Sequence, residues 1–403
     1  MQGYWVWELL AAKEDWPLQW VKPVKSEKIF GIFICDSYNE ILELNWNYRL
    51  KKFSNMIYSW SNRILDTLQQ RVEVIRIFGL SRVYYVAAVL PIKPAVVKKF
   101  ESLMGRYLWN FSGKLLRVAL DEMKNKKLEG GLNLPCLASM ADSLLFSQLC
   151  RLLRSGDRKT LGHVSYWLGD LLVSLVPDLR QLRARTRATE TPEYFAYVAD
   201  LVAEMMISEK VNAGTIKTLT NKSVYAELTS SFPPPKVVMN SNRDYRTAWR
   251  RLHSNVVNGK ARDILFLLLH NKLPVKERLF RIGMKNDPYC LKCAGAEVHD
   301  IVHFFCSCVA VCNTWSWLKR QVVQLGQMEA GVEDEEIINL CFVKSSRETE
   351  IVWLVGSYVL YVWEMVHIKK LGVKLEKFFG FLTFKYKMDQ AISPDRLQNL
   401  HYI

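Results

Sequence analysis

The sequence predicts a mainly α-helical chain built from several modules, with one short β segment near the N-terminus. Two observations support this class. Apolar side chains recur at intervals of three and four residues over long stretches, which is the spacing of one face of an α-helix. Half of the 403 residues are hydrophobic and 24% are charged, while Gly and Pro number 19 and 13. This composition excludes bulk disorder, collagen and low-complexity sequence, and it provides enough apolar residues for a buried core.

The first half of the chain is expected to contain the β segment and the long helices. The apolar run from Lys28 to Cys35 has the length and β-branched content of a buried strand. Three stretches repeat apolar residues with helical spacing and a fourth is helical by length: residues 46–64, 97–111, 139–153 and 70–89. The pair Gly130-Gly131 breaks the chain ahead of residue 139.

The second half should also be helical. Residues 155–212 are moderately helical, and Ser230–Lys236 contains three consecutive prolines, which is typical of a linker. Helical spacing then resumes, a short helix should begin at Pro274 and end at Gly283, and an acidic loop at residues 333–336 precedes a helical tail. We therefore divide the chain into residues 1–36, 37–154, 155–242, 243–325 and 326–403.

The net charge of +15 is concentrated in two segments. Residues 93–127 carry +6 and residues 236–292 carry +9, so the rest of the chain is close to neutral. Clustered cations are the electrostatic footprint of a nucleic-acid partner, because they neutralise phosphates and release counterions. A generic basic surface that keeps the protein soluble is the competing explanation.

The N-terminus and the apolar segments indicate a soluble intracellular protein, nuclear or cytoplasmic, with no membrane partner. The first residues lack the basic region and small-residue cleavage site of a secretory signal. The longest apolar run, Ile351–Trp363, is followed by Glu364 and is shorter than the roughly 20 residues that span a bilayer.

Five of the nine cysteines lie between Cys290 and Cys312. A Cys-x-x-Cys pair such as Cys290 and Cys293 forms a tight knuckle whose two thiolates can bind one tetrahedral zinc ion. Zinc then needs two more nitrogen or sulfur ligands from nearby, and His303 with Cys308 can supply them.

Helical periodicity favours a different ligand set. His299, His303 and Cys306 share one face of an ideal helix, whereas His303 and Cys308 lie about 140° apart and could share a metal only if the helix ends or distorts between them. Cys312 also stays open as a ligand, and a redox-active or incidental Cys-x-x-Cys is the alternative without metal. Four filled positions leave none for water, so we expect a structural zinc rather than a catalytic one.

Several motifs, in order along the chain, resemble the C-terminal half of the reverse transcriptase of LINE-type (non-LTR) retrotransposons. Pro17–Trp20 and Lys28-Ile-Phe-Gly-Ile look like the exit from the polymerase palm. Trp60 with Arg63 and the stretch Gln70–Ile75 look like the family's thumb signature, and Leu128–Leu134 resembles its "GGLGL" element. The knuckle is similar to the family's zinc-binding domain, in which Cys-x2-Cys is followed by His-x4-Cys and a tryptophan, here Trp315. The resemblance covers about residues 15–155 and 245–370.

The resemblance implies a domain organisation and a ligand set. Residues 1–36 would be a palm-exit remnant, 37–154 a helical thumb, 155–242 a helical connector and linker, 243–325 the zinc-binding domain and 326–403 a C-terminal helical tail. The family motif selects as ligands of structural Zn²⁺ Cys290, Cys293, His303 and Cys308. This set implies a break in the helix near Phe305–Ser307.

The resemblance also implies RNA or DNA as partners during target-primed reverse transcription, together with the palm and fingers of the polymerase. One group of cations is expected to contact the template–primer backbone: Lys93, Lys98, Lys99 and Arg106. A second group is expected to contact RNA or DNA beside the knuckle: Arg243, Arg246, Arg250, Arg251, Lys272 and Arg278.

The chain is not expected to be an enzyme on its own. Reverse transcriptases hold two Mg²⁺ ions with palm aspartates, two of them adjacent, and this sequence contains no Asp-Asp pair. Because the fingers and palm are also missing ahead of residue 19, we expect no catalytic residue and no Mg²⁺ site. The expectation is a non-catalytic fragment that binds zinc and nucleic acid. The alternative is a zinc-stabilised helical protein-interaction module, domesticated or decayed, that binds no nucleic acid.

Overall fold

The computed structural model describes residues 26–392, apart from 36, 64, 110–117, 156–157, 177–192, 209–211, 213, 237–244, 296 and 329–330. This part of the chain is mainly α-helical, as the sequence predicts, and its sheet has two strands. Two predictions, the palm-exit motif at Pro17–Trp20 and the nucleic-acid contact at Arg243, lie outside the described residues.

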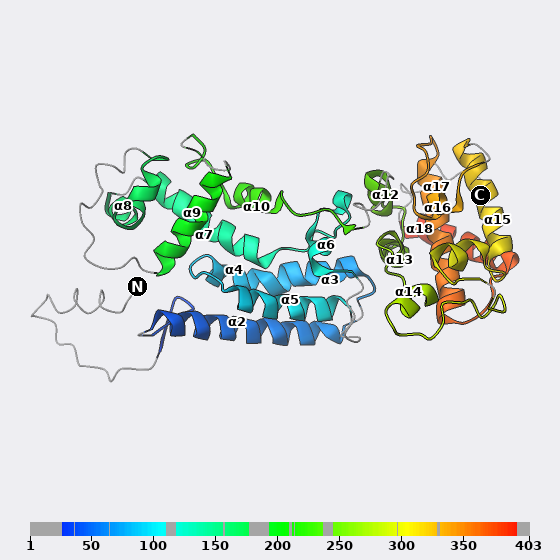
Figure 1. Cartoon of the computed structure of the whole chain (residues 1–403), viewed down its shortest axis with the longest axis horizontal. Helices are drawn as coiled ribbons and strands as arrows, with labels where there is room; N and C mark the ends of the chain where they lie inside the picture. The colour runs from blue at the N-terminus through cyan, green and yellow to red at the C-terminus, as the bar shows by residue number, and fades with distance from the viewer. Residues whose placement is uncertain are drawn as a thin grey trace, which may run out of the picture. The chain divides into compact units, whose positions relative to one another are not determined.

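The chain divides into two compact units, each of which combines segments distant in sequence (Figure 1). Unit 1 contains Met1–Arg63, Glu73–Asn110 and Pro135–Phe232, and unit 2 contains Ile64–Val72, Phe111–Leu134 and Pro233–Ile403. Most of the expected connector, residues 155–242, thus belongs to unit 1. The expected C-terminal tail belongs to the same unit as the cysteine-rich segment.

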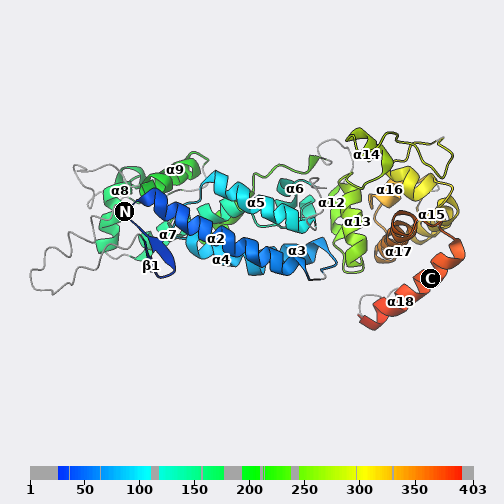
Figure 2. The same ribbon diagram turned by 90° about the horizontal axis from the view of Figure 1, so that it is seen from below.

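Unit 1 begins with a β-hairpin instead of the single buried strand predicted for Lys28–Cys35. Strands β1 (Glu27–Ile29) and β2 (Ile32–Ile34) pair antiparallel next to the start of the first long helix (Figure 2), and neither is buried. The two residues between them, Phe30 and Gly31, both have positive φ, which is the backbone of a tight hairpin turn and is easiest for glycine. The prediction was wrong because Gly31 places a turn in the middle of the apolar run.

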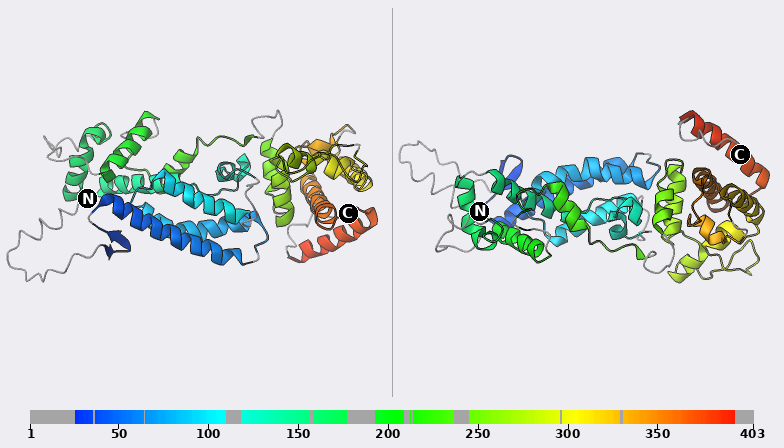
Figure 3. Two further views of the ribbon diagram at one scale, coloured as in Figure 1. Left: turned by 60° about the horizontal axis from the view of Figure 1, so that its bottom comes forward. Right: turned by 90° about the horizontal axis from the view of Figure 1, so that it is seen from above.

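Three helices of unit 1 pack side by side (Figure 3). The long helix α2 (Tyr38–Ser61) lies against α5 (Pro94–Leu108) and α4 (Ser81–Ala87). In their core the Trp46 indole Nε1–H donates to Pro91 O at 2.9 Å, and Phe53 lies edge-on to Phe100 with ring centroids 5.2 Å apart. Helix α3 (Leu68–Val74) continues into α4 through a π-helical turn, η1 (Ile75–Leu80). The helices predicted from apolar spacing at 46–64 and 97–111 are confirmed within the described residues.

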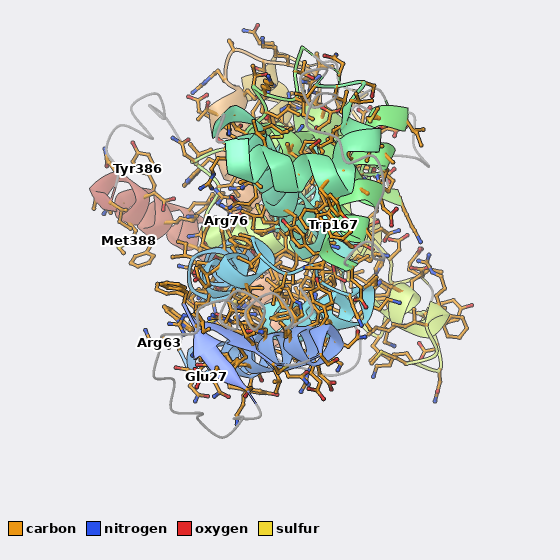
Figure 4. All side chains as sticks on the ribbon, turned by 90° about the vertical axis from the view of Figure 1, so that its left-hand side faces the viewer. Glu27, Arg63, Arg76, Trp167, Tyr386 and Met388 are labelled. Carbon is orange, nitrogen blue, oxygen red and sulfur yellow. The ribbon has the colours of Figure 1, made fainter. Side chains whose placement is uncertain are left out.

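A second helical cluster completes unit 1. It consists of α7 (Leu137–Ser155), α8 (Arg158–Leu172), α9 (Glu193–Ile207) and α10 (Asn221–Thr229). The Tyr197 hydroxyl of α9 donates to Asp142 Oδ1 of α7 at 2.5 Å. Trp167 of α8 stacks on Phe195 of α9 with centroids 6.0 Å apart, and Figure 4 shows it among the crowded side chains of this cluster. These helices share one apolar core, so the connector is a packed element.

Unit 2 is built around α17 (Glu348–Val362), which is buried along most of its length. Helices α13 (Gly259–Leu269) and α15 (Cys312–Gly326) pack against it. The remaining helices are α6 (Leu120–Lys124), η2 (Lys127–Glu129), α12 (Tyr245–Leu252), α14 (Lys276–Arg281), η4 (His303–Ser307), α16 (Asp334–Ile338), η5 (Trp363–Ile368) and α18 (Leu375–Ile392).

The apolar run at 351–363 is part of a longer helix than its sequence suggests. Helix α17 continues through the π-helical turn η5, and Glu348–Ile368 is long and apolar enough to cross a membrane by length and composition. However, 67% of its most apolar window is buried within the protein. Its packing against α13 and α15 makes it the core helix of unit 2.

The predicted acidic loop at residues 333–336 is instead the start of a helix. Glu333 caps α16, and the Glu336 carboxylate accepts the Glu333 backbone N–H at 3.4 Å. Acidic side chains in the first turn are stabilised by the partial positive charge of a helix N-terminus, so this run of charge favours a helix.

A buried carboxylate attaches the segment Ile64–Val72 to the rest of unit 2. Asp263 on α13 accepts the Leu68 backbone N–H at 2.8 Å, at the start of α3. Burial raises the pKa of Asp263 to about 7, and this effect outweighs the hydrogen bond and the nearby Arg71 and Arg262, which lower it. The folded protein therefore binds this proton more tightly than the unfolded chain, in which the carboxyl titrates at about 3.9.

We expect Asp263→Asn to remove a pH-dependent loss of stability. Because the folded-state pKa is raised, the stability that wild-type unit 2 gains from the protonated carboxyl is lost as the pH rises from about 4 through 7. Asparagine is neutral and keeps an oxygen that can accept from Leu68. Urea denaturation between pH 5 and 8 should show a decline of roughly 2–3 kcal/mol in wild type that is absent from the variant. A variant less stable than wild type at pH 8 would show that the ionised carboxylate stabilises the fold through Arg71 and Arg262.

Candidate metal centre

The turn between Cys290 and Cys293 is held by backbone hydrogen bonds. The Gly295 N–H donates to Cys290 O at 2.9 Å, and a β-bridge between Tyr289 and Val298 closes the loop. Gly295 has a φ of +75°, in the left-handed region that glycine adopts without strain. These contacts fix the spacing of the two cysteines.

His303 and Cys308 come from a helical turn that changes pitch. Residues His303–Ser307 form the π-helical turn η4, and the Cys308 backbone N–H donates to His303 O at 2.9 Å across five residues. The helix ends there, because Cys308 has an extended backbone with φ −59° and ψ 137°. The predicted break near Phe305–Ser307 is therefore confirmed.

Four potential ligand atoms converge. The sulfurs of Cys290, Cys293 and Cys308 and a ring nitrogen of His303 all lie within 4.8 Å of one another. Cys308 Sγ is 3.8 Å from each of the other two sulfurs, and Cys293 Sγ is 3.5 Å from His303 Nε2. A tetrahedron with Zn–S of about 2.3 Å and Zn–N of about 2.0 Å has S···S edges of about 3.8 Å and S···N edges of about 3.5 Å. These three separations match the edges of a tetrahedral zinc site.

The surroundings of the cluster favour a bound cation. Cys290, His303 and Cys308 are buried, and Cys293 is half-buried. Burial, and then the neighbouring cysteines, raise the pKa of the Cys308 thiol to about 12. Three thiolates this close therefore need a cation to stay ionised, and thiolate with imidazole in a tetrahedral arrangement suits zinc.

His303 is oriented by two polar neighbours. Its backbone N–H donates to Asp300 Oδ1 at 2.7 Å, and its Nδ1 lies 3.3 Å from Ser307 Oγ. A hydroxyl that accepts from Nδ1–H favours the tautomer in which Nε2 is free to bind a metal. Sequence analysis did not identify Asp300 or Ser307, although their spacings of three and four residues from His303 are those of neighbours on a helix.

The other candidate ligands lie outside the cluster. His299 Nδ1 accepts the Lys276 backbone N–H at 3.1 Å, Cys306 is buried elsewhere, and Cys312 Sγ lies 3.8 Å from Val309 O. In the part of the chain that the structure describes, the Cys290, Cys293, His303 and Cys308 cluster is the one group of three or more His, Cys, Asp or Glu side chains placed to hold a metal ion.

Residues far along the chain support the cluster. The Tyr358 hydroxyl on α17 donates to Phe305 O within η4, and Trp315 packs on Tyr358 with ring centroids 5.4 Å apart. Beyond η5, the Val373 N–H donates to Ala310 O at 3.1 Å, close to Cys308 in sequence. The metal loops and the C-terminal segment therefore stabilise one another.

The four cations predicted to contact the template–primer backbone lie on or next to α5. Lys98, Lys99 and Arg106 are exposed, and the two lysines line a shallow cavity of about 590 Å³ between α2 and α5. Lys93 is exposed as well and donates to Asn39 Oδ1 at 2.8 Å. The structure thus brings Lys98 and Lys99 together at one cavity, whereas Lys93 and Arg106 lie at opposite ends of α5.

The second predicted group is more dispersed. Arg246 is exposed on α12, and Lys272 and Arg278 are half-buried. Arg250 is exposed and pairs with Glu348 at 3.2 Å. These four side chains all reach the surface of unit 2.

Arg251 is a structural residue, and it cannot serve as the nucleic-acid contact that the sequence predicts. Its side chain is 1% exposed. The guanidinium donates to Leu340 O at 2.8 Å and to Phe342 O at 2.6 Å, and it pairs with Glu348 at 2.7 Å. Arg251 therefore ties α12 to the start of α17. The sequence places Arg250 and Arg251 side by side, but it does not indicate which of them faces the core.

Residues 222–315 match the family model described as zinc-binding in reverse transcriptase. The match includes all four residues of the cluster and ends at Trp315. No curated protein matches the chain. The match supports a reverse-transcriptase-associated zinc-binding domain in this segment, which confirms that part of the resemblance drawn from the sequence.

We expect Arg251→Gln to destabilise unit 2, with Arg250→Gln as the matched control. Loss of the buried guanidinium leaves two buried carbonyls without their donor and removes the closer of the two ion pairs of Glu348, which typically costs about 3–5 kcal/mol. Arg250 pairs with the same carboxylate, but its side chain is 54% exposed, so its replacement should cost less than about 1 kcal/mol. Urea denaturation measures both changes, and equal losses would contradict the structural role of Arg251.

Proposed function

We propose that Cys290, Cys293, His303 and Cys308 bind one structural Zn²⁺. The observation that carries this proposal is the convergence of three sulfurs and one imidazole within the segment that matches the zinc-binding family. The metal would cross-link the knuckle loop to the turn that follows His303, and it would supply folding free energy. Four side-chain ligands complete a tetrahedral site, so no position is left for a reactive water.

We further propose that the chain is a non-catalytic, intracellular part of a LINE-type reverse transcriptase, and that it binds RNA or DNA in support of target-primed reverse transcription. In this proposal unit 1 is the thumb-like part and unit 2 carries the zinc-binding domain. The absence of an Asp-Asp pair in the sequence supports a chain without catalytic residues or a Mg²⁺ site. The palm and fingers of the polymerase would be its protein partners.

Accessible cations in both units support the nucleic-acid proposal. In unit 1, Lys98 and Lys99 line the cavity between α2 and α5, and neither side chain forms an ion pair with a described residue. In unit 2, Arg246, Lys272 and Arg278 reach the surface of the segment around the knuckle. Exposed charges without an ion-pair partner among the described residues, such as Lys98 and Lys99, retain their attraction for phosphate and release counterions when it binds.

A protein-interaction module is the second candidate function, and helix α18 favours it. Phe384 and Ile392 are 64% and 69% exposed, and Met388 between them is 46% exposed. Their spacing of four residues forms an apolar line along one face of the helix. Exposed apolar patches of this kind are typical of protein contacts.

The zinc proposal predicts one metal ion per chain and a defined ligand set. Cys308→Ser should lose the zinc, whereas Cys312→Ser should keep it because that sulfur lies outside the cluster. Elemental analysis measures the stoichiometry. Cobalt substitution reports the geometry, because a tetrahedral thiolate site gives intense d–d and sulfur-to-metal charge-transfer bands.

Two further measurements make the ligand assignment testable. Chelation should increase hydrogen exchange around residues 290–312 while α2 and α5 stay protected, because the metal stabilises unit 2. Retention of one zinc by the double variant Cys290→Ser with Cys293→Ser would refute the assignment.

Nucleic-acid binding predicts a salt-dependent affinity for RNA. With the full-length, zinc-loaded chain, the logarithm of the affinity for a fluorescent mixed-sequence RNA should fall linearly with the logarithm of salt concentration, by roughly 0.7–0.9 per phosphate contacted. Arg246→Glu with Lys272→Glu should weaken binding and reduce this slope. The control pair Lys344→Glu with Lys377→Glu changes exposed lysines outside the basic segments and should not. A slope near zero would remove the RNA proposal and leave the interaction module.

A further inference from the structure

The hairpin and α2 gather three cations around one tyrosine in unit 1. Lys28 Nζ lies 4.8 Å from the centroid of the Tyr48 ring, and Arg49 Cζ and Lys52 Nζ each lie 5.6 Å from it. Phe33 packs edge-on against the same ring, with centroids 5.3 Å apart. We call Lys28, Tyr48, Arg49 and Lys52 the Tyr48 cluster. None of the three cations belongs to the basic segments identified from the sequence.

The position of Lys28 is fixed by a clamp between β2 and α2. The Asn45 side chain accepts the Phe33 N–H at 2.9 Å and donates to Phe33 O at 2.8 Å. Phe33 is the cross-strand partner of Lys28, so this clamp holds Lys28 next to α2. Tyr48 and Lys52 follow Asn45 by three and seven residues, which places them on the same side of the helix.

The turn of the hairpin is held as well. Arg49 Nη2 donates to Gly31 O at 3.3 Å, and the Tyr85 hydroxyl of α4 donates to Phe30 O. Asn45 is 1% exposed and also donates to Ile41 O at 2.8 Å, so the clamp is a buried, fully used amide. The Tyr48 cluster is therefore built on a supported framework.

The three charges are not offset by any carboxylate that the structure describes. Within the described residues, neither Lys28 nor Arg49 nor Lys52 forms an ion pair. Glu27 adjoins Lys28 at the hairpin (Figure 4), but side chains alternate along a strand, so it faces the opposite side. Like charges around one ring repel one another, and the ring attracts each exposed cation only weakly. An anion bound among the three cations would replace this repulsion with attraction.

A second basic site lies on the adjoining side of α2. Lys51, next to Lys52, lines the cavity between α2 and α5 together with Lys98 and Lys99. The polar side chains of Asn47, Ser54 and Ser102 and the apolar side chain of Leu103 also line this cavity. Cations thus continue from the Tyr48 cluster across α2 into the cavity. Two basic sites on adjoining sides of one helix suit a ligand whose charge repeats along a chain.

We propose that the Tyr48 cluster binds the phosphodiester backbone of a nucleic acid whose strand continues over α2 to the cavity lined by Lys98 and Lys99. This inference rests on the proposed nucleic-acid function and assigns it a site in unit 1, independent of the metal centre. Beside its lysines the cavity presents amide and hydroxyl groups, which suit a strand that offers both phosphate and sugar oxygens. These groups can donate to the phosphate and sugar oxygens of a strand.

Lysine footprinting of the full-length, zinc-loaded chain tests the site directly. The probe is a single-stranded mixed-sequence RNA, and fluorescence anisotropy establishes the concentration at which the chain is saturated. Bound RNA should protect Lys28 and Lys52 from acetylation, as measured by mass spectrometry. Lys222 on α10, exposed in the same unit, should stay reactive. Unchanged reactivity of Lys28 and Lys52 at saturation overturns the inference.

Matched variants separate this site from general net charge. Lys28→Gln with Lys52→Gln should reduce the magnitude of the salt slope by roughly 1.5, because two phosphate contacts are lost. Arg151→Gln with Lys222→Gln removes the same charge from exposed positions elsewhere in unit 1 and should leave the slope unchanged. Tyr48→Leu keeps every charge but removes the ring that gathers them, so it should weaken binding, whereas Tyr48→Phe should not. Equal effects of the two double variants would overturn the inference.

The outcomes distinguish this inference from the proposed function. A chain without salt-dependent RNA affinity fails both. RNA binding that survives Lys28→Gln with Lys52→Gln but is lost in Arg246→Glu with Lys272→Glu refutes the Tyr48 site alone. If RNA protects Lys28 and Lys52, and the variant Arg246→Glu with Lys272→Glu keeps full RNA affinity, the Tyr48 site is supported. The proposed contacts beside the knuckle are then refuted. Protection by polyglutamate equal to that by RNA overturns the assignment of phosphate as the ligand.

Discussion

The structure of unit 2 depends on the π-helical turn η4, whose backbone hydrogen bond spans five residues where an α-helix spans four. Because the Cys308 N–H bonds to His303 O across five residues and the helix then ends, the His303 ring and the Cys308 sulfur can meet the knuckle cysteines. In a regular α-helix the two side chains would lie about 140° apart. The wider turn places Phe305 O where the Tyr358 hydroxyl donates to it. A buried carbonyl without a donor is destabilising, so the geometry of the metal cluster and the position of α17 are set together.

This coupling explains why the zinc-binding segment does not end at its last cysteine. Lys292, between the two knuckle cysteines, donates to Leu371 O at 3.2 Å. Two residues after Cys308, Ala310 O accepts the Val373 backbone N–H. At the other end of the unit, Arg251 links α12 to the carbonyls of Leu340 and Phe342. The C-terminal residues therefore supply both the core helix and the anchors of the module. A boundary drawn at residue 325 separates groups that the fold needs together.

The sequence predicts those features that depend on local spacing. Helices α2, α5 and α7 follow from apolar residues repeated at three and four positions, and the knuckle follows from Cys-x-x-Cys. Spacing alone left the remaining ligands open, because ideal helical periodicity does not anticipate a π-helical turn; the family motif resolved the choice in favour of His303 and Cys308. The hairpin was missed because neither of its strands is buried and a Phe-Gly turn interrupts the apolar run. The burial of Arg251 beside an exposed Arg250 could not be predicted. The two residues are identical in type and adjacent in sequence, and they differ only in the direction in which each side chain points from the helix.

The count of cations along the chain predicts an anionic partner, but it does not predict which surface would bind such a partner. The basic segment at residues 236–292 includes Arg262, whose guanidinium donates to Leu252 O at 3.2 Å and to Ser254 O at 2.9 Å, so its hydrogen bonds are used within the fold. The cations around Tyr48 lie outside both basic segments, and no carboxylate in the described part of the chain pairs with them. An incoming phosphate gains most from charges of the second kind, because they are not already compensated. The proposed Tyr48 site therefore depends on strand register, since a slip of one residue would turn Lys28 to the opposite face of the hairpin and disperse the charges.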